Sequence, residues 1–134
     1  MSARPRKFKT VTADDSVRRG RIAKAEQFLQ VADDARELAV ADLEVADAAV
    51  TLYVHAGIAA SDAICVQRLG KHSKGQDHQD AVALLATVDS DASIYLNNLL
   101  AMKTRAGYGH DPISLTNLVR AERAARALMR MVQE

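Results

Sequence analysis

Residues 42–69 read DLEVADAAVTLYVHAGIAASDAICVQRL, and this stretch decides the fold. Its apolar side chains recur every three or four residues, which is the period of an α-helix. They form two lines along that helix, one through Val50 and Ile64 and the other through Leu52 and Val66. A helix that is apolar on two sides usually lies in the middle of a bundle or at a subunit interface. We therefore predict that this segment is the central helix of the protein.

The composition of the whole chain also favours a helical protein. The 134 residues suffice for one domain, 49% of them are apolar, and only 4% are aromatic, with no Trp. Few aromatic residues and many alanines favour helices over a β-sandwich. The sequence has no uninterrupted apolar run of about 18 residues for a membrane span and no apolar N-terminal leader. A single cysteine excludes an internal disulfide, so we predict a cytoplasmic protein.

Four further helices are predicted around the central one. They cover residues 12–38, 78–88, 91–103 and the segment from Pro112 to the C-terminus, with Ser114 as the N-cap of the last helix. The polar stretch 71–77 is predicted to be an exposed loop, and no strand-like alternation is found. The expected fold is therefore all-α, an up-and-down bundle of about five helices that dimerises.

The chain divides into a basic N-terminal arm, residues 1–20, and a helical domain, residues 21–134. Residues 1–21 carry seven basic groups and two acidic ones, although the whole chain has a net charge of only +1. Such an arm often binds polyanions or contacts another subunit. A merely solvated terminus is the alternative, and in either case the arm is expected to run into the first helix.

Residues 103–112 read KTRAGYGHDP and form the candidate functional segment, a polar, glycine-bearing interruption between two apolar helices. In an unbroken helix, Arg105 and His110 would lie about 140° apart around the axis. Gly107 and Gly109 permit backbone angles that are closed to other residues, so the chain can leave the helix and fold back. We therefore expect the guanidinium and the imidazole to converge on one space.

An arginine and a histidine together suit phosphodiester chemistry. Arginine stays charged and its planar fork matches phosphate oxygens, while histidine titrates near neutrality and moves protons. Cleavage of RNA through its own 2′-hydroxyl needs one group that removes a proton and another that donates one. Because this segment supplies one histidine, a two-fold dimer would place two copies about one cleft. Dimerisation is therefore expected to be required for function.

The order of the helices and the Arg-x-x-x-x-His spacing of Arg105 and His110 resemble the HEPN family (higher eukaryotes and prokaryotes nucleotide-binding), whose motif has four to six intervening residues. The resemblance covers roughly residues 20–134. It implies a small, commonly dimeric helical bundle. Many members of the family act as metal-independent endoribonucleases in toxin–antitoxin, phage-defence or RNA-processing systems, and others only bind nucleotides or proteins. Arg105 and His110 would then be the catalytic pair. Active members often carry a polar residue such as Asn directly after the arginine, where this chain has Ala106.

Residues around the motif are predicted to bind RNA or a nucleotide: Lys103, Tyr108, Arg120 and Arg123. Tyr108 would stack on a base, and the arginines of the last helix would follow a phosphate backbone. The expected partners are a second copy, RNA or a nucleotide, and a cognate antitoxin or other protein. The alternative is a non-catalytic HEPN-like module that binds nucleotide, nucleic acid or a partner protein. A structural protein that merely assembles is the third possibility.

No cofactor and no metal are predicted. His72, Asp77, His78 and Asp80 lie close together in the sequence, but their spacing fits no zinc-site pattern. Cys65 has apolar neighbours and is expected in the core.

A polar line crosses the central helix through Asp47, Thr51, His55 and Asp62, at spacings of four, four and seven residues. A buried polar line needs hydrogen-bond partners. We interpret it as an internal hydrogen-bond network, with a position in a dimer cleft as the alternative.

Overall fold

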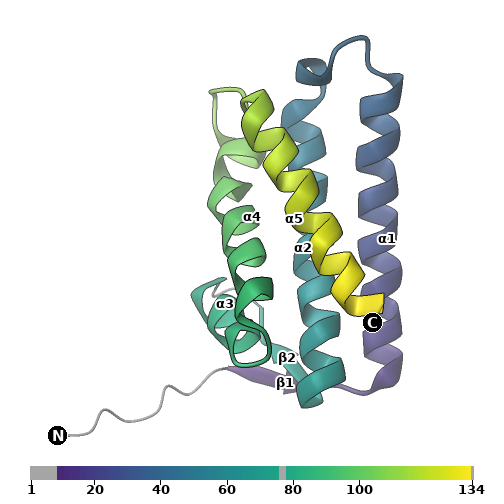
Figure 1. The fold of residues 1–134 in the computed structure, drawn as a ribbon, viewed down its shortest axis with the longest axis vertical. Coiled ribbons are helices and arrows are strands. Elements are labelled where there is room, and N and C mark those ends of the chain that lie inside the picture. Colours follow the sequence, from purple (N-terminus) through teal and green to yellow (C-terminus); the bar gives the residue numbers. More distant parts are fainter. Residues whose placement is uncertain (1–8, 76–77, 134) are drawn as a thin grey trace, which may run out of the picture.

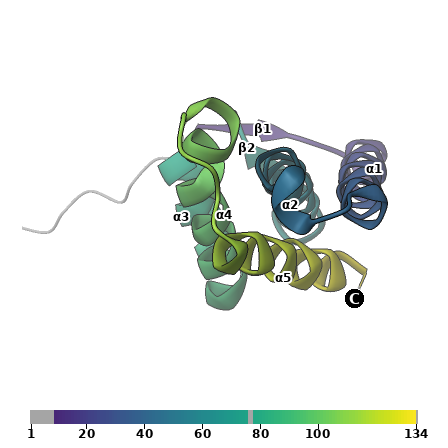
Figure 2. The same ribbon diagram turned by 90° about the horizontal axis from the view of Figure 1, so that it is seen from above.

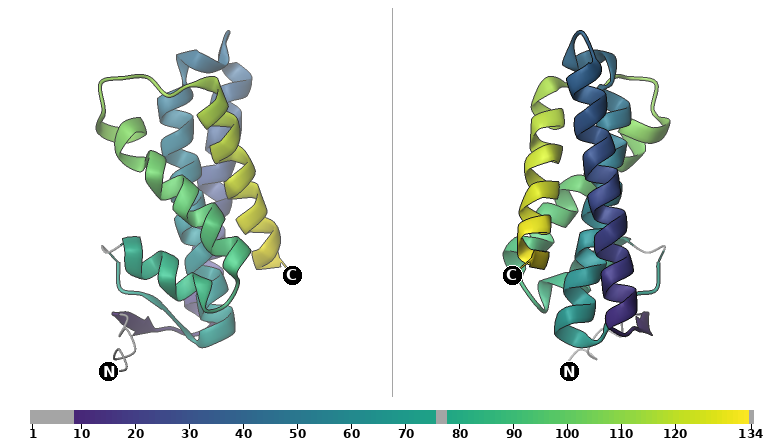
Figure 3. Two further views of the ribbon diagram at one scale, coloured as in Figure 1. Left: turned by 60° about the vertical axis from the view of Figure 1, so that its left-hand side comes forward. Right: turned by 90° about the vertical axis from the view of Figure 1, so that its right-hand side faces the viewer.

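The computed structural model describes residues 9–75 and 78–133 and confirms the all-α bundle (Figure 1). Its five α-helices in these residues are α1 (Asp15–Leu38), α2 (Ala46–Leu69), α3 (His78–Ala86), α4 (Ser90–Tyr108) and α5 (Leu115–Gln133). The helices α1, α2, α4 and α5 run alternately up and down, while the short α3 lies at one end of the bundle (Figures 1 and 3). Residues 1–8 of the predicted basic arm lie outside the described residues.

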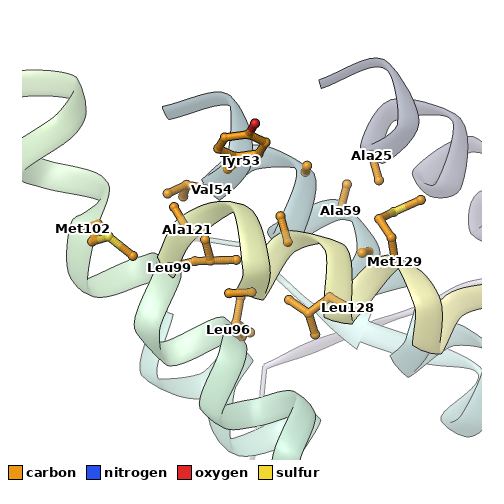
Figure 4. Packing of buried hydrophobic residues seen from close by; sticks show 14 of the residues in the cluster. Ala25, Tyr53, Val54, Ala59, Leu96, Leu99, Met102, Ala121, Leu128 and Met129 are labelled. Carbon is orange, nitrogen blue, oxygen red and sulfur yellow. The ribbon is translucent and has the colours of Figure 1, made fainter. Parts of the chain in front are cut away.

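Helix α2 is the central helix, as its two apolar lines predict. It packs against α1, α4 and α5, and most of its residues are buried. A Cβ at Gly57 would overlap the side chain of Leu99 on α4, so this position allows the two helices to approach closely. Figure 4 shows the core at this contact, where Leu96 and Leu99 of α4 meet Leu128 of α5.

By length and apolarity alone, α2 would also qualify as a membrane-crossing helix. However, 72% of its apolar window is buried inside the bundle. A central helix surrounded by other helices has the same composition because it is covered on all sides.

The ends of α1 and α2 follow local signals. Asp14 caps α1 by accepting a hydrogen bond from the Val17 backbone N–H at 3.1 Å, so the helix begins at Asp15 rather than near Thr12. A 3₁₀ turn (η1, Asp42–Glu44) precedes α2, which therefore begins four residues later than predicted. Gly70 ends α2 with a φ of 69°, in the left-handed region that glycine enters freely.

Partly buried polar contacts connect α5 to α1 and α2. The Tyr53 hydroxyl donates to Asp33 Oδ1 at 2.8 Å, and Arg126 Nη2 donates to the two oxygens of Asp33 at 2.7 and 2.6 Å. Burial raises the pKa of Tyr53 to about 12, so its hydroxyl remains a donor at neutral pH. These contacts fix the position of α5 and hence of the connection that leads into it.

The prediction of an exposed loop over 71–77 is wrong at its start. Residues Lys71–Ser73 form β2, which pairs antiparallel with β1 (Thr10–Thr12) in a register that sets Val11 opposite His72. The side chains of His72 and Ser73 are buried. Figure 2 shows this small sheet and α5 on opposite sides of α2. Strands of three residues are too short to show a sequence period, and their pairing joins distant parts of the chain.

Helix α4 runs five residues beyond the predicted end at Lys103. Gly107 is helical, and the chain leaves the helix at Gly109, whose N–H donates to the Thr104 carbonyl at 3.0 Å. Gly109 has a φ of −74° and a ψ of 160°, which any residue can adopt, so the expectation of backbone angles special to glycine is wrong at both positions. Ala106 is buried in the core, and its packing holds the last turn in place despite the two glycines. The predicted cap of α5 is confirmed, because the Asn117 N–H donates to Ser114 Oγ at 3.2 Å.

Candidate functional site

The connection between α4 and α5 brings Arg105 and His110 to one carboxylate. Arg105 Nη2 lies 3.8 Å from Asp111 Oδ2, and His110 Nε2 lies 3.5 Å from Asp111 Oδ1. The side chains of Arg105 and His110 are 55% and 96% exposed. We call Arg105, Tyr108, His110 and Asp111 the α4–α5 corner. The bend after Gly109 thus places a guanidinium and an imidazole at the two oxygens of the same acid.

The residues that follow the corner attach it to the core. The Ile113 N–H donates to Asp47 Oδ1 on α2 at 2.8 Å, and the Ile113 side chain is 1% exposed. The Thr51 hydroxyl donates to the carbonyl of Asp47 at 2.8 Å. A Cβ at Gly109 would lie only 2.9 Å from the Arg105 carbonyl oxygen, so the tight departure from α4 favours glycine there. Part of the polar line on α2 therefore positions the corner.

The other predicted binding residues lie in three different places. Tyr108 belongs to the corner and is 84% exposed, so its ring is open to stacking. Arg120 and Arg123 line a groove between α4 and α5, together with Tyr95. Lys103 lines a separate cavity, where its Nζ is 3.2 Å from His78 Nε2. The six residues predicted from the sequence therefore do not form one site.

That cavity, which we call the interhelical pocket, has a volume of about 350 Å³ and is lined by residues of α1, α2, α3, α4 and the two strands. Its polar lining residues include the following set: Arg21, His55, Ser61, Asp62, His72, Lys74, His78 and Lys103. Its apolar wall includes Ile58, Leu96 and Leu100. The strands and α3 lie at the end of the bundle opposite the α4–α5 connection (Figure 3).

The polar groups of the pocket gather at two ends. At one end Arg21 Nε lies 3.7 Å from Asp62 Oδ2, and His72 is also close enough to act on the Asp62 charge. At the other end Lys103 contacts His78 and acts electrostatically on His55. His55 and Asp62 are seven residues apart on α2, a rise of about 10 Å.

Burial dominates the titration of the pocket groups. It raises the pKa of Asp62 above its usual value, against the opposing effects of His72 and Arg21. It lowers the pKa of His55, and the positive charge of Lys103 lowers it further. Burial next to Asp62 raises the pKa of the Cys65 thiol to about 12, so this thiol stays protonated and is a core residue, as predicted.

Sequence reasoning missed this pocket as a site. The seven-residue spacing of His55 and Asp62 on α2 was the available signal, because it places both side chains on one helical face. Arg21 and His72 come from elements whose pairing with α2 the sequence did not reveal. Within residues 9–75 and 78–133, no group of three or more His, Cys, Asp or Glu side chains is arranged to hold a metal ion.

Comparison with known proteins identified no relative of this chain. No protein-family model matches the chain, and no curated protein matches it. The site must therefore be interpreted from its own geometry.

Proposed function

We propose that this protein is a metal-independent endoribonuclease of the HEPN type that works as a homodimer through the α4–α5 corner. The observation that supports the proposal is the approach of Arg105 and His110 to the two oxygens of Asp111. The Asp111 carboxylate lies next to both the guanidinium and the imidazole, and an anionic phosphate can bind in the same position. Both side chains are exposed, which suits a site that a second protomer completes.

In this mechanism the scissile phosphate replaces Asp111 beside Arg105. Arg105 binds the phosphate oxygens and stabilises the charge that develops on them. His110 of one protomer removes the proton of the 2′-hydroxyl, whose oxygen then forms a bond to phosphorus. The partner's His110 donates a proton to the 5′-oxygen as its bond to phosphorus breaks. The products are a 2′,3′-cyclic phosphate and a free 5′-hydroxyl.

Other exposed groups are suited to collect the RNA. Tyr108 stacks on a base next to the cleavage point, and Arg120 and Arg123 on α5 contact the phosphate backbone. Lys103 lies in the interhelical pocket and is left out of this RNA path. The activity of a cytoplasmic toxin or defence enzyme of this kind must be regulated, so a cognate antitoxin or other partner protein remains part of the proposal.

The experiment is cleavage of end-labelled RNA by the purified full chain in excess chelator. Arg105→Ala and His110→Ala should each reduce the cleavage rate by about 100-fold or more, the usual effect of removing a general acid or base. Arg68→Ala is the matched control, because Arg68 is exposed at the far end of α2. Cleavage that requires a divalent metal, or that survives both corner substitutions, would overturn the proposal.

The second candidate is a non-catalytic module of the same fold that binds nucleotide, nucleic acid or a partner protein. It is favoured by Ala106, which is buried and leaves no polar side chain directly after Arg105. If this candidate is correct, RNA binds the dimer and remains intact. Arg105→Ala would then weaken RNA binding, and no cleavage would be detected in either protein. Binding measured beside cleavage in the same samples distinguishes the two.

A further inference from the structure

We propose that the interhelical pocket is a binding site for a small organic carboxylate that has an apolar body and a hydrogen-bond donor at its far end. This site is separate from the RNA chemistry proposed for the corner. The pocket suits such a ligand in its charge, its unsatisfied buried groups and the spacing between its ends.

Among the described residues that line the pocket, positive charges outnumber negative ones. The cations in this described part are Arg21, Lys74 and Lys103, and the carboxylate is that of Asp62. Within the described chain, Lys103 Nζ has no carboxylate within ion-pair distance, and its recorded partner is the imidazole of His78. A buried or half-buried ammonium is best stabilised by an opposite charge. The Lys103 end therefore suits the negative group of a ligand.

The charge at this end favours one negative charge over two. Burial and the neighbouring lysine lower the pKa of His55, so its ring is neutral at physiological pH. The Lys103 ammonium beside a neutral ring matches a carboxylate, which has one charge. A phosphate monoester would bring about two charges into the same space.

The opposite end of the pocket has a hydroxyl and a carboxylate that lack hydrogen-bond partners among the described residues. Ser61 is 4% exposed, and its Oγ has no hydrogen-bond partner in the structure of residues 9–75 and 78–133. The neighbouring Asp62 is 17% exposed and has a cation at 3.7 Å, beyond hydrogen-bond length. Buried polar groups are nearly always hydrogen-bonded in folded proteins. A hydroxyl or amino group of a ligand would supply the missing donor to Asp62 and a partner to Ser61.

An apolar wall joins the two ends. Ile58 lies on α2 one turn from His55 and one turn from Asp62, and Leu96 and Leu100 line the pocket from α4. A flat or branched hydrocarbon body would pack on these side chains. The cavity of about 350 Å³ is large enough for such a molecule and too small for a folded partner.

The test uses 3-(4-hydroxyphenyl)propionate as the probe, in an amide NMR titration of the full chain. Two analogues each lack one group: 3-phenylpropionate has no donor, and 4-propylphenol has no carboxylate. The probe should shift the amides of Ile58 and Leu100 saturably, and each analogue should bind about tenfold more weakly, the effect of one lost polar contact. Tighter binding of phenyl phosphate would overturn the assignment of a carboxylate.

Two variants locate the two ends of the ligand. Lys103→Met should abolish the preference for the probe over 4-propylphenol, and Asp62→Leu should abolish its preference over 3-phenylpropionate. Lys24→Met is the matched control for charge, because Lys24 is exposed on α1 and does not line the pocket. If a variant fails to fold, the comparison of the three probes on the wild-type protein still decides. Shifts that never saturate, or equal affinity for all three probes, would overturn the proposal.

Discussion

The α4–α5 corner and the interhelical pocket contain similar side chains in opposite physical settings. At the corner, Arg105 and His110 are exposed to solvent, and both lie next to the exposed carboxylate of Asp111. In the pocket, Asp62 is largely buried, and its pairing with Arg21 is incomplete. Water and salt screen the corner, whereas packing holds the pocket groups out of water. The corner charges can therefore be changed at little cost to folding, whereas the buried charge of Asp62 already lowers stability.

The largest expected effect tests the hydrogen bond from Ile113 to Asp47 that attaches the α4–α5 connection to α2. Asp47→Ala removes the acceptor of the Ile113 N–H and leaves this buried donor unpaired. The free energy of unfolding should fall by about 1–3 kcal/mol, the usual result of leaving a buried donor unsatisfied. Urea unfolding measures the loss.

Asp47→Asn is the control for this change, because the amide keeps an oxygen that can accept the same hydrogen bond. It should recover most of the lost stability. Equal stability of the Ala and Asn variants would mean that the corner is held by its surface contacts and not from α2.

The next effect is a pH-dependent change in the free energy of unfolding, caused by the buried carboxyl group of Asp62 in the pocket. Because burial raises the pKa of Asp62, the folded state prefers the protonated acid. That contribution is fully present below the unfolded pKa near 3.8 and is lost as the pH rises through the raised folded value. Asp62→Asn should therefore gain stability relative to wild type between pH 4 and pH 7. Urea unfolding at several pH values measures this difference.

A matched control separates Asp62 from other titrating groups. Glu26→Gln changes an exposed carboxylate on α1, and its stability relative to wild type should stay the same over this range. His55 acts in an overlapping pH range with the opposite sign, because its lowered pKa reduces stability as the pH falls below about 6.5. Both proteins of each pair retain His55, so its effect cancels. An Asp62→Asn protein that loses stability toward pH 7 would contradict a raised pKa.

The two regions also differ in how far the sequence reveals them. The corner is a local feature, since Arg105, Gly109 and His110 are neighbours in the chain, and the glycines between Arg105 and His110 predicted that the chain folds back there. Its detail escaped prediction, because the burial of Ala106 extends α4 past Lys103 and only the packed structure reveals that burial. The long apolar period of α2 and the cap at Ser114 are strong local signals, and both predict the fold well.

The pocket is not local and could not be predicted in the same way. It needs β1 to pair with β2, two strands of three residues separated by α1 and α2. It also needs Arg21 of α1 and Lys103 of α4 to meet around α2. The sequence carries His55 and Asp62 on one face of α2, but no period or spacing indicates which distant side chains join them.

The smallest effect on folding is expected at the corner, where the same substitution should also change the affinity for RNA. Asp111→Asn keeps the size of the side chain and removes its charge. The free energy of unfolding should change by no more than about 0.5 kcal/mol, since exposed ion pairs contribute little. RNA affinity should rise roughly two- to fivefold in low salt, because Asp111 then no longer competes with the phosphate for Arg105. The gain should shrink at 0.5 M salt, where such interactions are screened over about 4 Å. A loss of RNA affinity in low salt would mean that Asp111 supports the bound RNA rather than occupying its place.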